Sequence, residues 1–162
     1  DYDNWNKWTN LSIDTRVPLI VRAPGLEGGL QSDALVELVD IYPTLAELSG
    51  LEIPEHVQGT SFVPLLRKPD LEWKKMIFTL WPHYRDKFDQ TVTGFSVKTE
   101  KYNYVEWTRL ATGEVLAAEL YDTVDDPAET INVVSLSGND EAVSEMKILL
   151  EAGWQKAIPI VR

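Results

Sequence analysis

The stretch KYNYVEWT, residues 101–108, carries bulky side chains at a spacing of two, with Tyr102 and Tyr104 alternating with Val105 and Trp107. That period is typical of a β-strand, whose successive side chains point to opposite faces. Three further stretches are strand-like and are separated by turn signals: KKMIFTLW (74–81), GFSVKT (94–99) and LAAELYD (116–122). We therefore predict a small antiparallel sheet of four strands in the part of the chain after residue 70.

Two helices are also predicted, one before the strands in the sequence and one after them. Residues 139–157 place one apolar stripe along a helix that Asn139 can cap. Earlier in the chain, the pattern predicts a helix from about Ile41 to Ser49, with Asp40 as its N-cap and Gly50 as its stop. The stripe of the C-terminal helix consists of Val143, Met146, Leu149, Leu150 and Trp154.

Two segments before residue 70 complete the expected core. VPLIVR, residues 17–22, is a short and nearly continuous apolar run, which predicts a strand buried on both faces as in a parallel sheet. Such a strand needs neighbours on each side, and the chain offers none, so we expect it to be the edge of a larger sheet. Residues 50–70 are predicted to be a loop whose apolar members reach the core: Phe62, Val63, Leu65 and Leu66.

Composition limits the classes of function. Lys and Arg number 15 against 26 Asp and Glu, a net charge of -11, which repels nucleic acid and anionic membrane surfaces. Cysteine is absent, which excludes disulfides, zinc thiolate sites and a cysteine nucleophile within these residues. The hydrophobic share of 44%, with six Trp and six Tyr, suits a packed domain. No apolar run is long enough for a transmembrane helix.

Few side chains are candidates for chemistry. The chain contains no Gly-x-Ser-x-Gly motif and no phosphate-binding glycine loop, and neither His56 nor His83 has metal-ligand spacing with another residue. His83, in LWPHYRD, either lines a substrate pocket or covers the sheet at a loop end, and residue types favour the second. DTVDDP, residues 122–127, is expected to be a turn built on Asp side chains rather than a calcium loop.

Lys7 is the remaining candidate, and it stands between Trp5 and Trp8. An ammonium group in a dry aromatic pocket can stabilise an oxyanion strongly. From residue types alone, however, a surface lysine whose stem lies over one of the tryptophans is the favoured interpretation.

Five stretches together resemble the C-terminal part of sulfatases, in the branch that contains iduronate-2-sulfatase and choline-sulfatase-like enzymes. The stretches are WNKWTNLSIDTRVPLIVRAPG, LVELVDIYPTLAELSGL, QGTSFVPLL, GFSVKTEKYNYVEW and ELYDTVDDPAETIN. Their order and spacing also fit the family, and they cover most of the chain up to about Val134. The resemblance implies an α/β fold of the alkaline-phosphatase-like superfamily, with an α+β C-terminal part formed by the antiparallel sheet and a helix.

The resemblance also implies an activity and its parts. Family members hydrolyse sulfate esters with a formylglycine nucleophile and a calcium ion, and a lysine in the Trp-x-Lys-x-Thr-Asn segment binds the sulfate. Lys7 matches that lysine. The nucleophile motif and the metal ligands have no match here, SFVPLLR has the wrong spacing for the nucleophile, and DYDN stands where the family usually has Gly-Glu-His-Gly. Lys98 takes the place of an arginine in many relatives, and we expect it to form a structural ion pair.

The sequence therefore predicts a partial sulfatase, in which residues 1–70 end the catalytic domain and residues 71–162 form a C-terminal subdomain. The chain alone is expected to be inactive and to need the N-terminal part of the enzyme as its partner. By resemblance, the parent is periplasmic, extracellular or lysosomal, and its substrates include sulfated sugars. Two alternatives remain: a phosphonate or phosphate monoester hydrolase of the same superfamily, and a non-catalytic module whose Trp- and Tyr-rich sheet binds carbohydrate.

Overall fold

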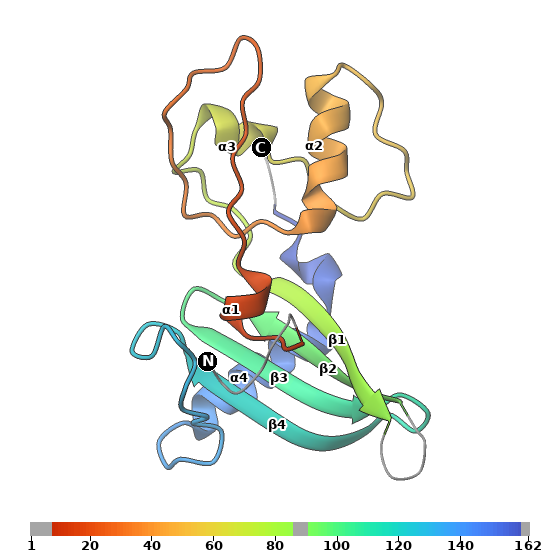
Figure 1. The fold of residues 1–162 in the computed structure, drawn as a ribbon, viewed down its shortest axis with the longest axis vertical. Helices are drawn as coiled ribbons and strands as arrows, with labels where there is room; N and C mark the ends of the chain where they lie inside the picture. The colour runs from red at the N-terminus through yellow and green to blue at the C-terminus, as the bar shows by residue number, and fades with distance from the viewer. Residues whose placement is uncertain (1–7, 86–90, 160–162) are drawn as a thin grey trace. The chain divides into compact units, whose positions relative to one another are not determined.

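The computed structural model describes residues 8–85 and 91–159, apart from the side chains of residues 83–85 (Figure 1). The chain forms two compact units. The first contains described residues 8–18 together with Phe78–Trp154, and the second contains Leu19–Ile77 with the described residues after Trp154. The division predicted between residues 70 and 71 stays a prediction.

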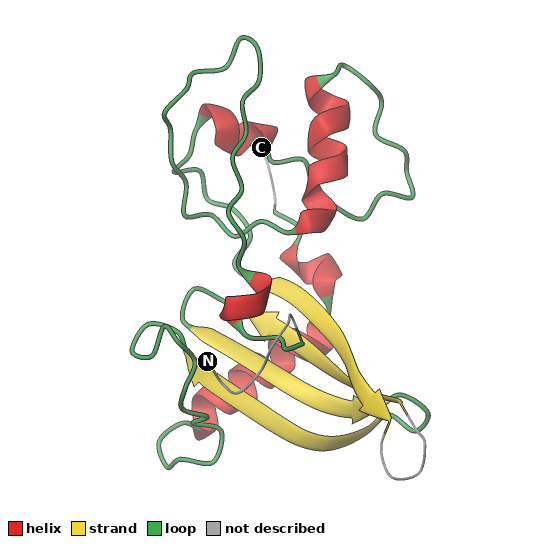
Figure 2. Ribbon diagram, in the orientation of Figure 1, coloured by secondary structure: helices red, strands yellow, loops and turns green. Residues whose placement is uncertain are grey.

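The first unit is built on one four-stranded sheet, as the alternating stretches predict (Figure 2). Its strands follow the order β1-β2-β3-β4, and the pairs β2–β3 and β3–β4 are antiparallel. Each predicted strand is confirmed within a few residues at its ends. The bounds are β1 Ile77–Arg85, β2 Thr91–Lys98, β3 Tyr102–Arg109 and β4 Glu114–Asp122.

Tight turns fix the register of the sheet. The Thr99 hydroxyl accepts hydrogen bonds from the backbone N–H groups of Lys101 and Tyr102, which closes the β2–β3 turn. Between β3 and β4, Gly113 has a φ of 72°, a left-handed conformation that glycine adopts without steric cost. The stretch ATGEV, residues 111–115, thus contains one of the turns whose signals separate the predicted strands.

The two faces of the sheet are covered by different parts of the same unit. The register pairs Gly94 with Trp107 and Lys98 with Asn103, so these four residues share one face because side chains alternate along a strand. This face carries the segment that ends in α1, Ser12–Thr15 (Figure 1). The opposite face carries α4, Asp140–Ala152, which contacts β2 and β3 and buries Met146 to 1% exposure.

The second unit has a small core beneath α2, Ile41–Leu48, which confirms the predicted helix. A single 3-10 turn, η1 (Leu38–Asp40), leads into α2, and a short helix, α3 (Val63–Arg67), lies where a loop was predicted. Pro64 near the start of α3 suits a first helical turn, because its missing N–H would have no partner there. The buried cluster consists of Phe62, Leu65 and Trp73, with Ala34, Val36, Ile41, Leu66 and Leu71 packed against it. After α4 the chain ends in a further 3-10 turn, η2 (Trp154–Ala157).

The prediction of a buried strand at Val17–Arg22 is wrong for this chain. These residues form neither helix nor strand, and Ile20 is 92% exposed. A β-branched apolar run forms a strand only where neighbouring strands pair with its backbone, and among the described residues it has no such neighbour.

The predicted N-caps have the right positions but not the expected bonds. Asp40 and Asn139 precede α2 and α4, yet neither side chain accepts a bond from its helix. The Asn139 amide donates to the carbonyl of Leu136 at 3.3 Å instead. The Asp40 carboxylate is fully buried and binds Lys74.

Candidate functional site

The two predicted site residues lie at the edge of what the structure describes. Lys7 falls outside the described residues, and His83 lies in β1, where its side chain is not described. Their described neighbours meet: the rings of Trp8 and Trp81 lie 6.5 Å apart between centroids, tilted by 37°. Trp8 follows Lys7 directly, and Trp81 stands two residues before His83 in β1.

The chain just after Lys7 is tied to its own short helix. Asp14, within α1, accepts hydrogen bonds from the backbone N–H and from the hydroxyl of Thr9, each at 2.8 Å. The Thr9 hydroxyl in turn accepts the N–H of Leu11 at 3.2 Å. One carboxylate thus closes the turn that carries residues 9–14.

Asn10 joins this turn to three strands of the sheet. It is 4% exposed, and its amide donates to the carbonyl of Gly94 in β2 at 3.0 Å. Its backbone carbonyl accepts the Asn103 amide from β3 at 3.1 Å, and its side-chain oxygen accepts the Thr79 hydroxyl from β1 at 3.3 Å. Gly94 is required here, because a Cβ would collide with the Asn10 amide and lie 2.9 Å from the Trp107 ring.

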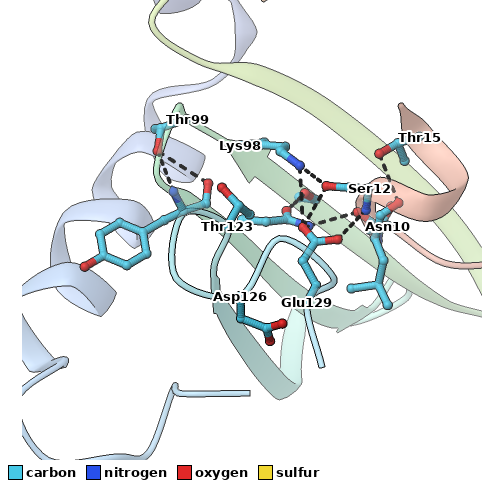
Figure 3. A network of polar contacts seen from close by, with 12 residues as sticks. Asn10, Ser12, Thr15, Lys98, Thr99, Thr123, Asp126 and Glu129 are labelled. Carbon is cyan, nitrogen blue, oxygen red and sulfur yellow. Dashed lines mark hydrogen bonds and ion pairs between the residues drawn. The ribbon is translucent and has the colours of Figure 1, made fainter. Parts of the chain in front are cut away.

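Glu129 closes the network from the other side (Figure 3). Its buried carboxylate accepts the N–H and the hydroxyl of Ser12, the latter at 2.9 Å, and the Asn103 amide at 2.9 Å. The Lys98 ammonium lies 3.5 Å from the same carboxylate and also donates to the Ser12 hydroxyl. The predicted structural ion pair of Lys98 is therefore confirmed.

An aspartate turn holds Glu129 in an unusual backbone conformation. Glu129 has a φ of 54°, which is uncommon for a residue with a side chain. The turn is closed by Asp126, whose carboxylate accepts the N–H groups of Thr130 and Ile131 at 2.5 and 2.8 Å. Desolvation opposes ionisation of Asp126, but hydrogen bonds led by the one from Ile131 outweigh it and lower its pKa.

The interpretation of DTVDDP as an Asp-based turn is confirmed. The Asp122 carboxylate accepts the N–H groups of Val124 and Asp125, so its oxygens serve the backbone. Among the described residues, no three His, Asp or Glu side chains are grouped in a way that suits a metal ion. The described residues therefore offer no ligand set for the calcium ion that the family resemblance implies.

The hydrogen bonds of Asn10, Ser12, Lys98 and Glu129 hold segments of this chain to one another. Lys98 and Glu129 compensate each other's charge, and Glu129 has donors for both oxygens, which removes most of the cost of burying a carboxylate. Of this network, the sequence analysis had singled out only Lys98, and it did so by the family resemblance rather than by residue type. The roles of Asn10, Ser12 and Glu129 were missed, because their partners in the network lie between 26 and 117 positions away in sequence.

The second unit offers an apolar groove of about 250 Å³. One wall comes from the exposed Leu19–Arg22 segment, and the other comes from α2 and Phe62. Its lining side chains are mostly aliphatic, and Ile20 is almost wholly open to solvent. In the part of the chain that the structure describes, no helix combines the length and apolar character needed to cross a membrane.

Comparison with known proteins gives a family match over most of the chain. The family model described as "N-sulphoglucosamine sulphohydrolase, C-terminal" matches residues 2–156. Arylsulfatase K of Xenopus laevis is 30% identical over 120 residues, covering 74% of this chain and 22% of the relative. Iduronate 2-sulfatase of Mus musculus is 27% identical, covering 82% of this chain and 35% of the relative.

A solved structure supports the fold. A phosphonate monoester hydrolase from Silicibacter pomeroyi matches with a TM-score of 0.68 and 20% identity, covering 85% of this chain and 28% of that chain. At this identity the likeness concerns the fold alone. In these three comparisons the chain spans between 22% and 35% of the matched protein's own length.

Proposed function

Because the chain belongs to the sulfatase family, in its region described as "N-sulphoglucosamine sulphohydrolase, C-terminal", we propose that it is the C-terminal portion of an enzyme that hydrolyses sulfate esters. The match over residues 2–156 is the observation that carries the proposal. Residues 1–70 complete the catalytic domain in this proposal, and residues 71–162 form the C-terminal subdomain.

Lys7 contributes the chemistry of this portion. Its ammonium group binds a sulfate oxygen, because an anion that enters a water-poor pocket needs a fixed cation to replace its hydration. Trp8, which follows Lys7 in the sequence, contacts the ring of Trp81 and is itself 52% exposed. His83, two residues after Trp81, contacts the group that carries the sulfate.

The nucleophile and the metal belong to the N-terminal part of the enzyme. No cysteine occurs in this chain, and the described residues contain no cluster suited to a metal. The formylglycine and calcium ion of the family are therefore assigned to the N-terminal part, which is also the partner of this chain. The exposed apolar groove beside Leu19–Arg22 supports such a partner, because exposed apolar patches of this kind mark interaction surfaces.

Sulfated sugars are the proposed substrate class. The name iduronate 2-sulfatase refers to a sugar acid, and that relative covers 82% of this chain. A phosphonate monoester hydrolase has the same fold, so the assay includes a phosphonate monoester beside the sulfate esters.

The test compares this chain alone with the full-length protein that carries it, against an aryl sulfate and a sulfated disaccharide. We expect turnover of both sulfates by the full-length protein and none by the 162 residues alone. Lys7→Met is expected to lower kcat/KM by roughly 10- to 100-fold, since one hydrogen bond to a charged group is worth about 1.5–3 kcal/mol. Lys75→Met is the control, because Lys75 is 83% exposed.

Three results would contradict parts of the proposal. Turnover by the isolated chain would refute the assignment of the nucleophile to another part. Faster turnover of the phosphonate ester would favour the alternative hydrolase. Saturable binding of plain and sulfated oligosaccharides by the isolated chain, followed by tryptophan fluorescence, would favour a carbohydrate-binding module.

A further inference from the structure

We propose that residues 19–22 are a docking strand. An extended segment from the N-terminal part of the full-length protein forms hydrogen bonds with their backbone and covers the apolar surface that their side chains form with α2. This inference rests on the part of the proposed function that makes the chain one portion of a larger enzyme. It names the surface and the form of that contact, and it does not depend on the role of Lys7.

The first observation is the open backbone of this segment. Residues 17–22 form neither helix nor strand, and within the described part of the chain their N–H and C=O groups take part in no hydrogen bond. Pro18 has no N–H, so an uninterrupted run of backbone donors begins at Leu19. A run of open donors and acceptors of this kind is a template for pairing with another strand.

The second observation is that the same residues expose apolar side chains in succession. Leu19, Ile20 and Val21 are 44%, 92% and 37% exposed. Single exposed apolar residues are normal on a soluble protein, whereas a contiguous apolar patch marks a contact surface. Ile20 and Val21 are also β-branched, which favours the extended backbone that a docked strand requires.

The third observation is the groove that the segment forms with α2. Ile41, Leu45 and Leu48 line it from α2, and Phe62 adds an aromatic ring. Leu45 is itself 57% exposed, so the apolar surface continues from the segment onto the helix. All of these residues belong to the second unit. The groove therefore widens the contact that a strand paired with residues 19–22 would make.

The open backbone decides the form of the occupant. A helix satisfies the N–H and C=O groups of its own backbone, so it would cover the apolar side chains but leave the backbone of residues 19–22 without partners. A lipid tail has no hydrogen-bonding groups at all. An extended chain serves both needs, because its backbone pairs along the segment while its alternate side chains meet the apolar surface.

Length and charge decide the source of the occupant. The chain spans between 22% and 35% of the matched proteins, so most of each matched protein lies outside it. A segment of the same polypeptide is also present at a high effective concentration. A second copy would instead bring together two chains that each have a net charge of -11. The occupant is therefore a segment of the N-terminal part rather than a second copy.

The experiment measures backbone hydrogen exchange of the full-length protein by mass spectrometry. We expect the amides of residues 19–22 to exchange about 1,000-fold or more slower than those of an unstructured chain, since the strands of a core open only rarely. Residues 27–31 are the internal control, because they are exposed and their N–H groups likewise have no described partner. Equally fast exchange in the two segments would overturn the inference.

The oligomeric state of the same sample separates the two sources of a strand. Slow exchange in a protein that sediments as a monomer supports a segment of the same chain. Slow exchange that appears only at concentrations where a dimer forms would assign the surface to a second copy and overturn the inference.

A pair of substitutions tests the apolar surface. Ile20→Lys should speed exchange at residues 19–22 by about tenfold or more, because a docked strand would have to cover the ammonium group. Ile148→Lys is the matched control: Ile148 lies in α4, is 65% exposed, and should leave exchange at residues 19–22 unchanged. Exchange that is the same in both variants would count against the inference.

Turnover of an aryl sulfate by the same full-length protein is scored separately. Turnover without slow exchange at residues 19–22 would overturn the docking strand and leave the proposed sulfatase activity in place. Slow exchange without turnover would leave the docking strand in place and remove the proposed activity.

Discussion

Lys74→Met is expected to destabilise the second unit far more than its exposure to solvent suggests. The Lys74 side chain is 4% exposed, and its ammonium lies 2.7 Å from Glu37 and 2.7 and 2.9 Å from the two oxygens of Asp40. Methionine retains most of the apolar stem, so the substitution removes the charge and three hydrogen bonds with little change of volume.

The magnitude follows from what is left behind. Asp40 is 0% exposed, and among the described residues two donors would remain to it, the backbone N–H groups of Thr60 and Glu37. Breaking a buried pair by removing one partner costs about 3–5 kcal/mol, because an uncompensated charge stays buried. For a domain of this size, that corresponds to a melting temperature lower by roughly 6–20 °C.

Hydrogen exchange of the α2 amides, followed by mass spectrometry, reports on this unit separately from the sheet. Lys75→Met is the matched control: its partner is Glu72, both side chains are more than 80% exposed, and such pairs contribute about 0–1 kcal/mol. Similar exchange in the two variants would refute the assignment of Lys74 to a buried cluster. Replacing Asp40 and Lys74 together by leucine and methionine should recover much of the loss.

Two further variants test the first unit. Gly94→Ala should raise hydrogen exchange in residues 9–12 and cost about 1–3 kcal/mol in thermal unfolding, because its Cβ would displace the Asn10 amide; Gly28→Ala, whose Cβ meets no atom within 4 Å, should be neutral. The lowered pKa of Asp126 stabilises the fold above the ordinary pKa of aspartate and ceases to do so as the carboxylate protonates. Asp126→Asn should therefore flatten the decline of stability below about pH 4, and an unchanged acid limb would count against this role.

The sheet was predictable because its signal is local. Period-two alternation in residues 101–108 and the turn at Gly113 involve neighbours in sequence, so each strand shows its own pattern. The same holds for α2, with its Gly50 stop, and for α4 as far as Ala152; the predicted helix ran past Gly153, whereas Trp154 lies in η2. The two shortest helices, α1 and α3, were missed, because four or five residues carry too little periodicity to indicate a helix.

The hydrogen-bonded network of Asn10, Ser12, Lys98, Asn103 and Glu129 could not be predicted, because no pattern among neighbouring residues indicates it. Ser12 and Glu129 are 117 positions apart, and nothing in the type of either residue predicts that they meet. The failure at Val17–Arg22 has the opposite cause. There the apolar, β-branched run is a strong local signal for a strand. A strand also needs a neighbouring strand to hydrogen-bond with its backbone, and the described residues supply none.

The distribution of polar and apolar groups supports the view that geometry, more than stability, governs this chain. Both units bury an ion pair that joins distant segments, Lys74 with Asp40 and Lys98 with Glu129. At the same time Ile20 is 92% exposed. A fold that maximised its own stability would have the reverse pattern, since buried apolar surface stabilises at about 25 cal/mol per Å² whereas buried ions cost free energy to desolvate. Under the proposed function, an apolar surface that faces the rest of an enzyme would give a reason for the exposure of Ile20.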